Sequence, residues 1–443
     1  MLKKIYITTK DLAENRQAKQ KFDLKLPNNS MIPYLPDRVP QHVLMQIFTY
    51  LDRIDLIRLA GVCKYLRDLI FTSPQIWRTI RLKLSCRQYP MCNKSALWYA
   101  KLFGIHFKDL LIVCDHVRPH ISCKTMTVCL RNILLSLGQT RLTSLVIREG
   151  RLVNATVPVV SSLVEILTRI LTRCRDLQHF GMPCALWTVK DGSKVLDTLW
   201  STSRGSLKSL RLDAYYVPPE DGRRPAEFDR VTTGILSLTH LTILGIDYCV
   251  LNDAFINSLS RANIKIKVLI LFDLEVEGDW TQISKNAWVN LTQACPEMKV
   301  YFVTNGSTER IIPKLEPALK FYSIQMYVDV RASRTAPKVG EVLRHISTNF
   351  SRCLVRFDME IHFDDRITTS LLHLVRHCQH LVHVKITANF PNPKIKETIL
   401  KLIQNRRRQI YLRKYPNTAN KRARTNKVKG SGSRPAVATE RMS

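Results

Sequence analysis

The sequence predicts an α/β protein in which a small helical module precedes a long solenoid of strand–helix repeats. Two patterns carry this prediction. Residues 31–80 form a compact block of apolar residues at helical spacing, and residues 81–400 repeat a short apolar motif at an irregular period of 23 to 35 residues. A repeating unit of this length cannot bury its own apolar face, so neighbouring units must stack against one another.

The repeated motif is an apolar-x-x-apolar-x-apolar run, which predicts a strand whose last two anchors lie on one face. Copies of this run begin at Phe107, Leu142, Leu177, Leu207, Leu241, Ile266, Met298, Phe321, Leu354 and Leu381. Stretches with helical periodicity lie between the copies, for example residues 160–171, where apolar residues recur on one face. Strand, turn and helix therefore alternate along most of the chain.

Several repeats carry a cysteine three residues before the first anchor. These cysteines are Cys174, Cys295 and Cys378. The pattern resembles the cysteine-containing class of leucine-rich repeats, in which a cysteine at the end of a helix packs beneath the next strand. The repeats here are irregular, and the asparagine expected on the convex turn is mostly missing. The resemblance implies a leucine-rich-repeat-like solenoid over residues 81–400.

The helical module divides into three short segments. Pro40 suits the first turn of a helix, because its missing N–H needs no partner there. Asp55 is placed to cap a second helix, and a third helix is expected from Val62 to Phe71. Such a module has too small a core to be very stable alone. We therefore expect it to complete its burial against a partner.

The same block resembles the F-box motif. The residues that carry the resemblance are Leu35-Pro36, Val39, Ile47-Phe48-x-x-Leu51, Asp55-Leu56, Leu59, Val62-Cys63-Lys64, Leu66 and Trp77. One departure is that Tyr65-Leu66-Arg67 stands where the family often has Trp-Arg. F-box modules bind the adaptor Skp1, which docks on a cullin scaffold of a ubiquitin ligase.

The resemblance implies that twelve residues form the core of the module and its Skp1-facing surface. They are Leu35, Pro36, Val39, Leu44, Ile47, Phe48, Leu51, Leu56, Leu59, Val62, Cys63 and Trp77. Which of them face inward and which face Skp1 stays open. The alternative is a plain three-helix bundle whose apolar stripes are only core.

With repeats behind the module, the chain is expected to be a substrate-recognition subunit of a Skp1–cullin–F-box ubiquitin ligase. It would not be an enzyme and would need no cofactor. The repeats would hold an unidentified protein target close to a partner enzyme, and this proximity would raise the effective concentration of the target's lysines. No Gly-rich phosphate loop and no Gly-x-Ser-x-Gly elbow occurs in the sequence.

The formal net charge of +32 favours acidic partners. Residues 1–30 form a mixed, charged extension, and residues 401–443 hold thirteen Lys and Arg against one Glu. We expect this tail to be disordered, because it has few apolar residues to pack. Possible nuclear-import residues are Arg406, Arg407, Arg408, Lys421, Arg422, Arg424, Lys427 and Lys429.

The charge supports an alternative function, that of a basic nuclear binding protein which engages nucleic acid through its solenoid and tail. A basic surface that only aids solubility would show the same composition. No signal peptide and no apolar run long enough for a membrane helix is seen, so the expected location is the cytoplasm, the nucleus or both.

Two groups of residues contain the side-chain types that bind metal ions. One contains Cys114, Asp115, His116, His120 and Cys123, and the other contains His373, His377, Cys378, His380 and His383. The first fits no standard zinc spacing. In the second, histidines near a helix end also suit the helix dipole. We therefore expect no metal site, and we expect the twelve cysteines to be reduced.

Overall fold

The structure is a computed structural model. It describes residues 39–85, 90–115, 124–149, 157–217, 224–273, 282–305, 308–328, 336–361, 367–387, 393–404 and 409–413. The chain divides into two compact units, Met1–Gly306 with Pro313–Tyr322 and Ser307–Ile312 with Ser323–Ser443. No helix of the described residues is long and apolar enough to cross a membrane.

The first unit opens with the N-terminal helices α2 (Gln41–Phe48), α3 (Arg53–Ala60), α4 (Lys64–Thr72) and α5 (Pro74–Trp77). The expected cap of the second helix was wrong by three residues. Asp52 is the N-cap of α3, and its carboxylate accepts a hydrogen bond of 2.9 Å from the backbone N–H of Asp55. Asp55 lies in the first turn, where its negative charge suits the helix dipole.

A parallel sheet follows in the first unit. Its strands are β1 (Thr79–Ser85), β2 (Asp109–Asp115), β3 (Ser144–Arg148), β4 (His179–Gly181), β5 (Ser209–Arg211), β6 (Ile243–Asp247), β7 (Val268–Asp273) and β8 (Lys299–Thr304). Each strand pairs with the next one along the chain. This order is that of a solenoid, because each repeat contacts its sequence neighbours.

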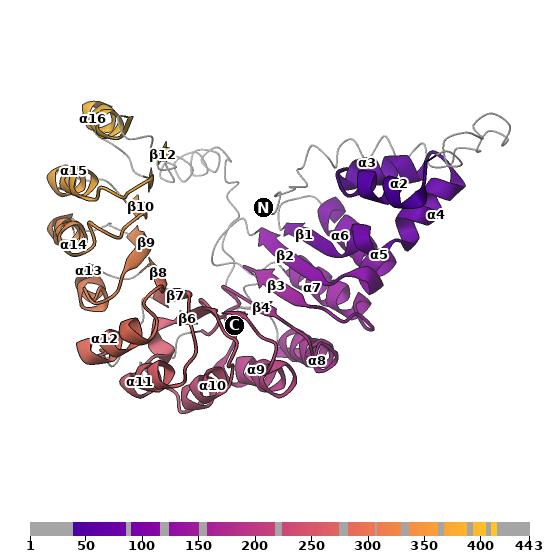
Figure 1. Cartoon of the computed structure of the whole chain (residues 1–443), viewed down its shortest axis with the longest axis horizontal. Coiled ribbons are helices and arrows are strands. Elements are labelled where there is room, and N and C mark those ends of the chain that lie inside the picture. Colours follow the sequence, from indigo (N-terminus) through magenta and orange to yellow (C-terminus); the bar gives the residue numbers. More distant parts are fainter. Residues whose placement is uncertain are drawn as a thin grey trace, which may run out of the picture. The chain divides into compact units, whose positions relative to one another are not determined.

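Helices connect these strands and cover one face of the sheet, which Figure 1 shows for α7 to α12. Their bounds are α6 (Pro90–Phe103), η1 (Gly104–His106), α7 (Lys124–Ser136), α8 (Val157–Arg173), α9 (Val189–Ser203), α10 (Glu227–Leu236), η2 (Tyr248–Val250), α11 (Asp253–Arg261) and α12 (Lys285–Ala294). The predicted fold, a helical module followed by a leucine-rich-repeat-like α/β solenoid, is confirmed.

The second unit continues the alternation of strand and helix. Its elements are α13 (Thr308–Ile311), η3 (Ile312–Lys314), β9 (Phe321–Val328), α14 (Ala336–Asn349), β10 (Arg356–Ile361), α15 (Thr368–His377), β11 (His383–Thr387), α16 (Pro393–Gln404) and β12 (Gln409–Arg413), with η3 and β9 crossing its boundary. Strands β9 to β12 pair in parallel. Regular structure therefore extends past residue 401, where we placed the start of the tail.

The predicted anchors lie in the core of the repeats, with one exception in β8. Tyr301 and Val303 were expected to point inward, but Val300 and Phe302 are the buried residues. The reason is a turn that is one residue shorter than in the preceding repeat. Lys299, directly after the anchor Met298, pairs with Val268, which lies two residues after the anchor Ile266. A slip of one residue moves each side chain of the strand to the other face.

The repeat cysteines lie directly after helices α8, α12 and α15 and are buried, with contacts to the preceding repeat for two of them. The Sγ of Cys174 accepts a hydrogen bond of 3.2 Å from the N–H of Leu142, in the preceding repeat. The thiol of Cys295 donates to the carbonyl of Ile264 at 3.4 Å. Cys378 is also fully buried. Each thiol thus fills a small apolar site between consecutive repeats.

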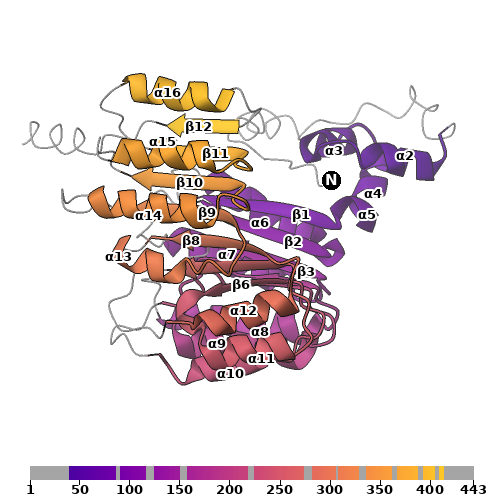
Figure 2. The ribbon, with the colours of Figure 1, turned by 60° about the vertical axis from the view of Figure 1, so that its left-hand side comes forward.

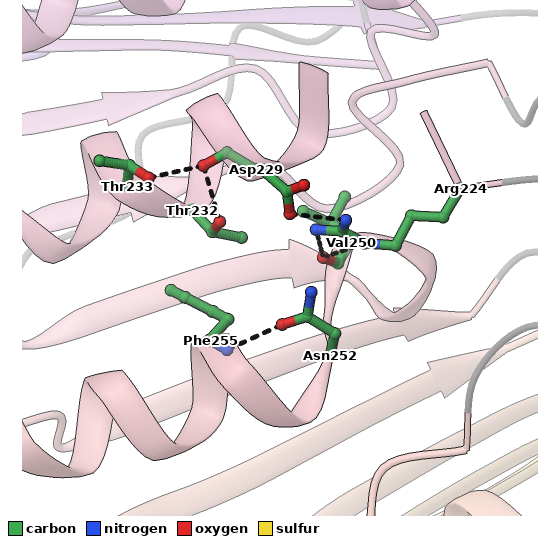
Figure 3. Close-up of polar contacts among 7 residues, drawn as sticks. All are labelled: Arg224, Asp229, Thr232, Thr233, Val250, Asn252 and Phe255. Carbon is green, nitrogen blue, oxygen red and sulfur yellow. Dashed lines mark hydrogen bonds and ion pairs between the residues drawn. The ribbon is translucent and has the colours of Figure 1, made fainter. Parts of the chain in front are cut away.

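The long loop before α10 ends in a firmly held arginine (Figure 3). The guanidinium of Arg224 donates to the carbonyl of Val250, at 3.2 Å for the shorter bond, and to Asp229 at 2.7 Å. The backbone carbonyl of Asp229 accepts from the hydroxyls of Thr232 and Thr233. In the next repeat, Asn252 caps α11. Arg224 therefore joins two consecutive repeats and is not free for a ligand.

Candidate functional site

The N-terminal helices enclose a small apolar core. Its fully or largely buried members are Leu44, Phe48, Leu56, Ala60, Leu66, Leu69, Ile70 and Trp77. They come from all four helices, which lie beside the first strands of the sheet (Figure 2). A core of this size gives limited stability on its own.

Trp77 joins this core to the repeats. Its ring is fully buried and stacks on Phe103 of α6, with centroids 3.7 Å apart and planes 8° apart. Its indole N–H donates to the carbonyl of Ile70 at 2.8 Å, so burial leaves no polar atom of Trp77 unpaired. Trp77 therefore positions the module and is not part of its surface.

A polar contact ties the module to the sheet at a second place. The guanidinium of Arg53 donates to the carbonyl of Thr79 at 2.7 Å and to that of Arg81 at 3.4 Å. Burial lowers the pKa of Arg53 and raises the pKa of Tyr99. An arginine remains charged in proteins in spite of such a shift, so Arg53 satisfies the strand carbonyls as a cation.

The module also exposes large apolar side chains. The exposed fractions are 47% for Ile47, 79% for Tyr50, 55% for Val62 and 40% for Tyr65. Four of the twelve large exposed apolar residues among the described part of the chain thus fall within 19 positions. These side chains are left available for contact with another protein.

The predicted site residues separate into three groups. Leu44, Phe48, Leu56 and Trp77 are buried, whereas Val39, Leu51, Leu59 and Cys63 are half-buried. Ile47 and Val62 are exposed. Leu35 and Pro36 lie outside the described residues. The exposed residues lie at the end of α2 and in the turn between α3 and α4.

Two residues of the exposed set were missed by the sequence analysis. Tyr50 follows the end of α2, and Tyr65 lies in the first turn of α4. Neither is one of the buried positions of α2 or α4, and an aromatic residue outside those positions is the signal that could have found them. The strand β1 was also missed, although Trp77, Ile80 and Leu82 repeat the spacing of the other strands.

The other candidate residues form no site that the structure describes. The possible import residues lie outside the described ranges, as do His116, His120 and Cys123. The rings of His373 and His377 stack with centroids 3.7 Å apart. The described residues contain no group of three or more His, Cys, Asp and Glu that could hold a metal ion.

Comparison with known proteins gives one result for this region. The model of the F-box-like family matches residues 36–83. No curated protein matches the chain. The chain therefore contains an F-box-like domain followed by a region of parallel strand–helix repeats. Such domains generally bind Skp1 and belong to substrate adaptors that are typically non-catalytic.

Proposed function

We propose that this protein is the substrate-recognition subunit of a Skp1–cullin–F-box ubiquitin ligase, with Skp1 bound by helices α2 to α4. One observation carries the proposal. The segment that matches the F-box-like family leaves Ile47 and Val62 in solvent, together with Tyr50 and Tyr65. Covering these side chains with a partner would be favourable, because it removes apolar surface from water.

The chemistry of the exposed residues supports a protein partner. Burying a fully exposed aliphatic side chain contributes about 1.5–3 kcal/mol, so the half-exposed Ile47 and Val62 would each contribute roughly half of that. Tyrosine is among the residues that most often dominate the binding energy of interfaces. The half-buried Leu51, in the turn between α2 and α3, and the half-buried Leu59 of α3 would lose their remaining exposure to water. The partner therefore completes the burial that the module leaves unfinished.

The repeats supply the second half of the proposed function. The sheet of the first unit has helices on one face, and its other face carries half-buried side chains such as Leu111, Val113 and Val146. The repeats would hold a protein target there or at the edge of the sheet. The rate of ubiquitin transfer would follow from proximity and not from a catalytic group of this chain.

Co-purification with Skp1 tests the proposal. The double variant Ile47→Asp/Val62→Asp should lose Skp1, because each new carboxylate would be desolvated in the interface. Both positions are exposed, so the midpoint of thermal unfolding should change little. Mass spectrometry of the co-purified proteins would identify the partners and the target together.

A matched control replaces two exposed apolar residues with aspartate elsewhere on the surface. Ile105→Asp/Leu135→Asp changes two exposed apolar residues of η1 and α7. This variant should retain Skp1. The proposal is wrong if the wild-type chain captures no Skp1, or if both double variants lose it equally.

The net charge of +32 supports a second candidate function, the binding of nucleic acid in the nucleus. It predicts nucleic-acid binding that weakens as salt is added and as residues 401–443 are removed. Nuclear import through the basic residues of the tail would be compatible with this function and with that of a ubiquitin-ligase subunit.

A further inference from the structure

The amino ends of the strands in the first unit form a continuous backbone ladder. Its residues are Arg78, Lys108, Thr143, Gln178, Lys208, Thr242, Lys267 and Lys299. From Lys108 onward, each backbone N–H donates to the carbonyl of the preceding member at 2.8 to 2.9 Å. Neighbouring strands lie about 4.8 Å apart, so the ladder is roughly 34 Å long. We call this set the amino-edge ladder.

The amino-edge ladder is strongly basic. Five of its eight members are Lys or Arg, and none is acidic. Arg78, Lys208, Lys267 and Lys299 are exposed, and Lys108 is half-buried. The helix ends and turns beside the ladder add further exposed cations, namely Arg141, Arg173, Arg175, Arg204, Arg261 and Lys265. Asp176 and Glu297 are exposed acidic residues of the same turns.

The cations of the ladder have no carboxylate partner among the described residues. The Nζ of Lys108 donates to the carbonyl of Arg141, and that of Lys208 donates to the side-chain oxygen of Gln178. Lys299 lies over the ring of Tyr322. The nearby carboxylate of Asp109 instead accepts hydrogen bonds from the hydroxyls of Thr79 and Thr143.

The opposite ends of the same strands show the contrasting arrangement. There the carboxylates of Asp115, Asp213 and Asp273 pair with Lys83, Arg211 and Lys314. The carboxylate of Asp247 accepts backbone N–H groups. Lys83, Arg211 and Lys314 are therefore neutralised by carboxylates within the fold, whereas the cations of the amino-edge ladder are not.

Helix dipoles account for only part of this charge. Helices end near the amino ends of the strands, and each helix C-terminus carries about half a negative charge, which favours one nearby Lys or Arg. The repeat before β7 has Arg261, Lys265 and Lys267, well beyond that need. An excess of positive charge therefore remains along the edge of the sheet.

We propose that the amino-edge ladder binds an acidic segment of the protein target, rich in Asp and Glu, in an extended conformation. The proposal rests on the proposed function as a substrate receptor. An extended peptide of about ten residues spans the ladder. The ladder contains no aromatic residue on which a base could stack, so an acidic peptide suits it better than a single-stranded nucleic acid.

Fluorescence anisotropy with a labelled oligoglutamate of about ten residues tests the proposal on the full chain. The triple variant Lys208→Glu/Lys267→Glu/Lys299→Glu should bind the peptide at least about tenfold more weakly, because several exposed ion pairs are lost together. The wild-type affinity should fall as salt is added.

The matched control changes the same amount of charge on helices of the same unit. Lys190→Glu/Lys194→Glu/Lys285→Glu alters three exposed lysines of α9 and α12. This variant should weaken peptide binding by less than about twofold. Its lysines lie near helix N-termini, away from the ladder, and salt screens charges at that separation. Equal losses in both triple variants would overturn the proposal and show a response to net charge alone.

Two further measurements separate the alternatives. If a single-stranded RNA loses affinity in the ladder variant while oligoglutamate does not, the ladder is a nucleic-acid site and the proposal is wrong. Co-purification of Skp1 should be the same for both triple variants. If the wild-type chain does not bind Skp1, the proposed function is wrong. The peptide measurement would still decide whether the ladder binds acidic peptides.

Discussion

The family motif predicts a tryptophan at position 77 but does not predict whether its side chain is buried or exposed. The motif places a tryptophan at this position, and the structure shows that it is buried against Phe103 with its N–H satisfied by Ile70. Ile47 and Val62 belong to the same motif but lie in solvent. Only the exposed members can be changed without disturbing the fold, so they are the informative positions for binding experiments.

Replacing Trp77 with Ala should therefore act on stability. Removing a fully buried tryptophan costs about 3–5 kcal/mol in the free energy of unfolding. Thermal or urea unfolding of the variant measures this cost. Trp98→Ala, at an exposed aromatic of α6, is the control and should cost much less. Equal costs at the two positions would contradict the burial of Trp77.

Cys129 provides a prediction that depends on pH. Burial raises the pKa of its thiol to about 11, and the thiol donates to the carbonyl of Asn93 at 3.3 Å. A raised pKa keeps the thiol protonated near pH 8, and only the thiolate reacts with iodoacetamide. Alkylation in the native protein should be roughly two-hundredfold slower than in urea, because an unperturbed thiol has a pKa of about 8.5.

Peptide mass spectrometry after timed alkylation measures this rate for each cysteine. The native rate at Cys129 should rise as the pH is raised toward 11, because the thiolate fraction grows. A native rate at pH 8 that equals the rate in urea would show that the thiol is accessible and unperturbed.

At the scale of elements, local signals and packing share control of where helices and strands begin. Asp52 and Asp55 are both able to cap α3, and the chain uses Asp52 while Asp55 pairs with Arg58 at 3.1 Å. In β8, a turn that is one residue shorter decides which face is buried. Neither choice is visible in the apolar pattern, because each alternative satisfies that pattern equally well.

The dependence of the N-terminal helices on α6 can be tested with fragments. A fragment of residues 31–85 lacks Phe103 and leaves Trp77 uncovered, so it should unfold without a cooperative transition. A fragment of residues 31–115 restores α6 and β2 and should gain helical signal and a sharper thermal transition. Circular dichroism measures both. A cooperative transition in the shorter fragment would indicate a self-contained bundle.

At the scale of the whole molecule, charge is arranged with respect to the strands of the first unit. Carboxylates at the carboxyl ends of the strands pair within the fold, and the cations of the amino-edge ladder do not. Because the strands are parallel and in register, residues far apart in the sequence form one continuous row. The proposed binding of Skp1 and of an acidic target would thus use separate surfaces of one unit.

The sequence by itself determined the alternation of strands and helices and the presence of the F-box-like module. Both depend on apolar spacing, which is local and survives irregular repeat lengths, as the buried anchors Leu145, Leu210 and Ile324 illustrate. Tertiary structure alone decided which apolar residues of the module remain in water and which charges remain unpaired. The physical reason is that burial and ion pairing depend on what other repeats place beside a residue, as Phe103 does for Trp77.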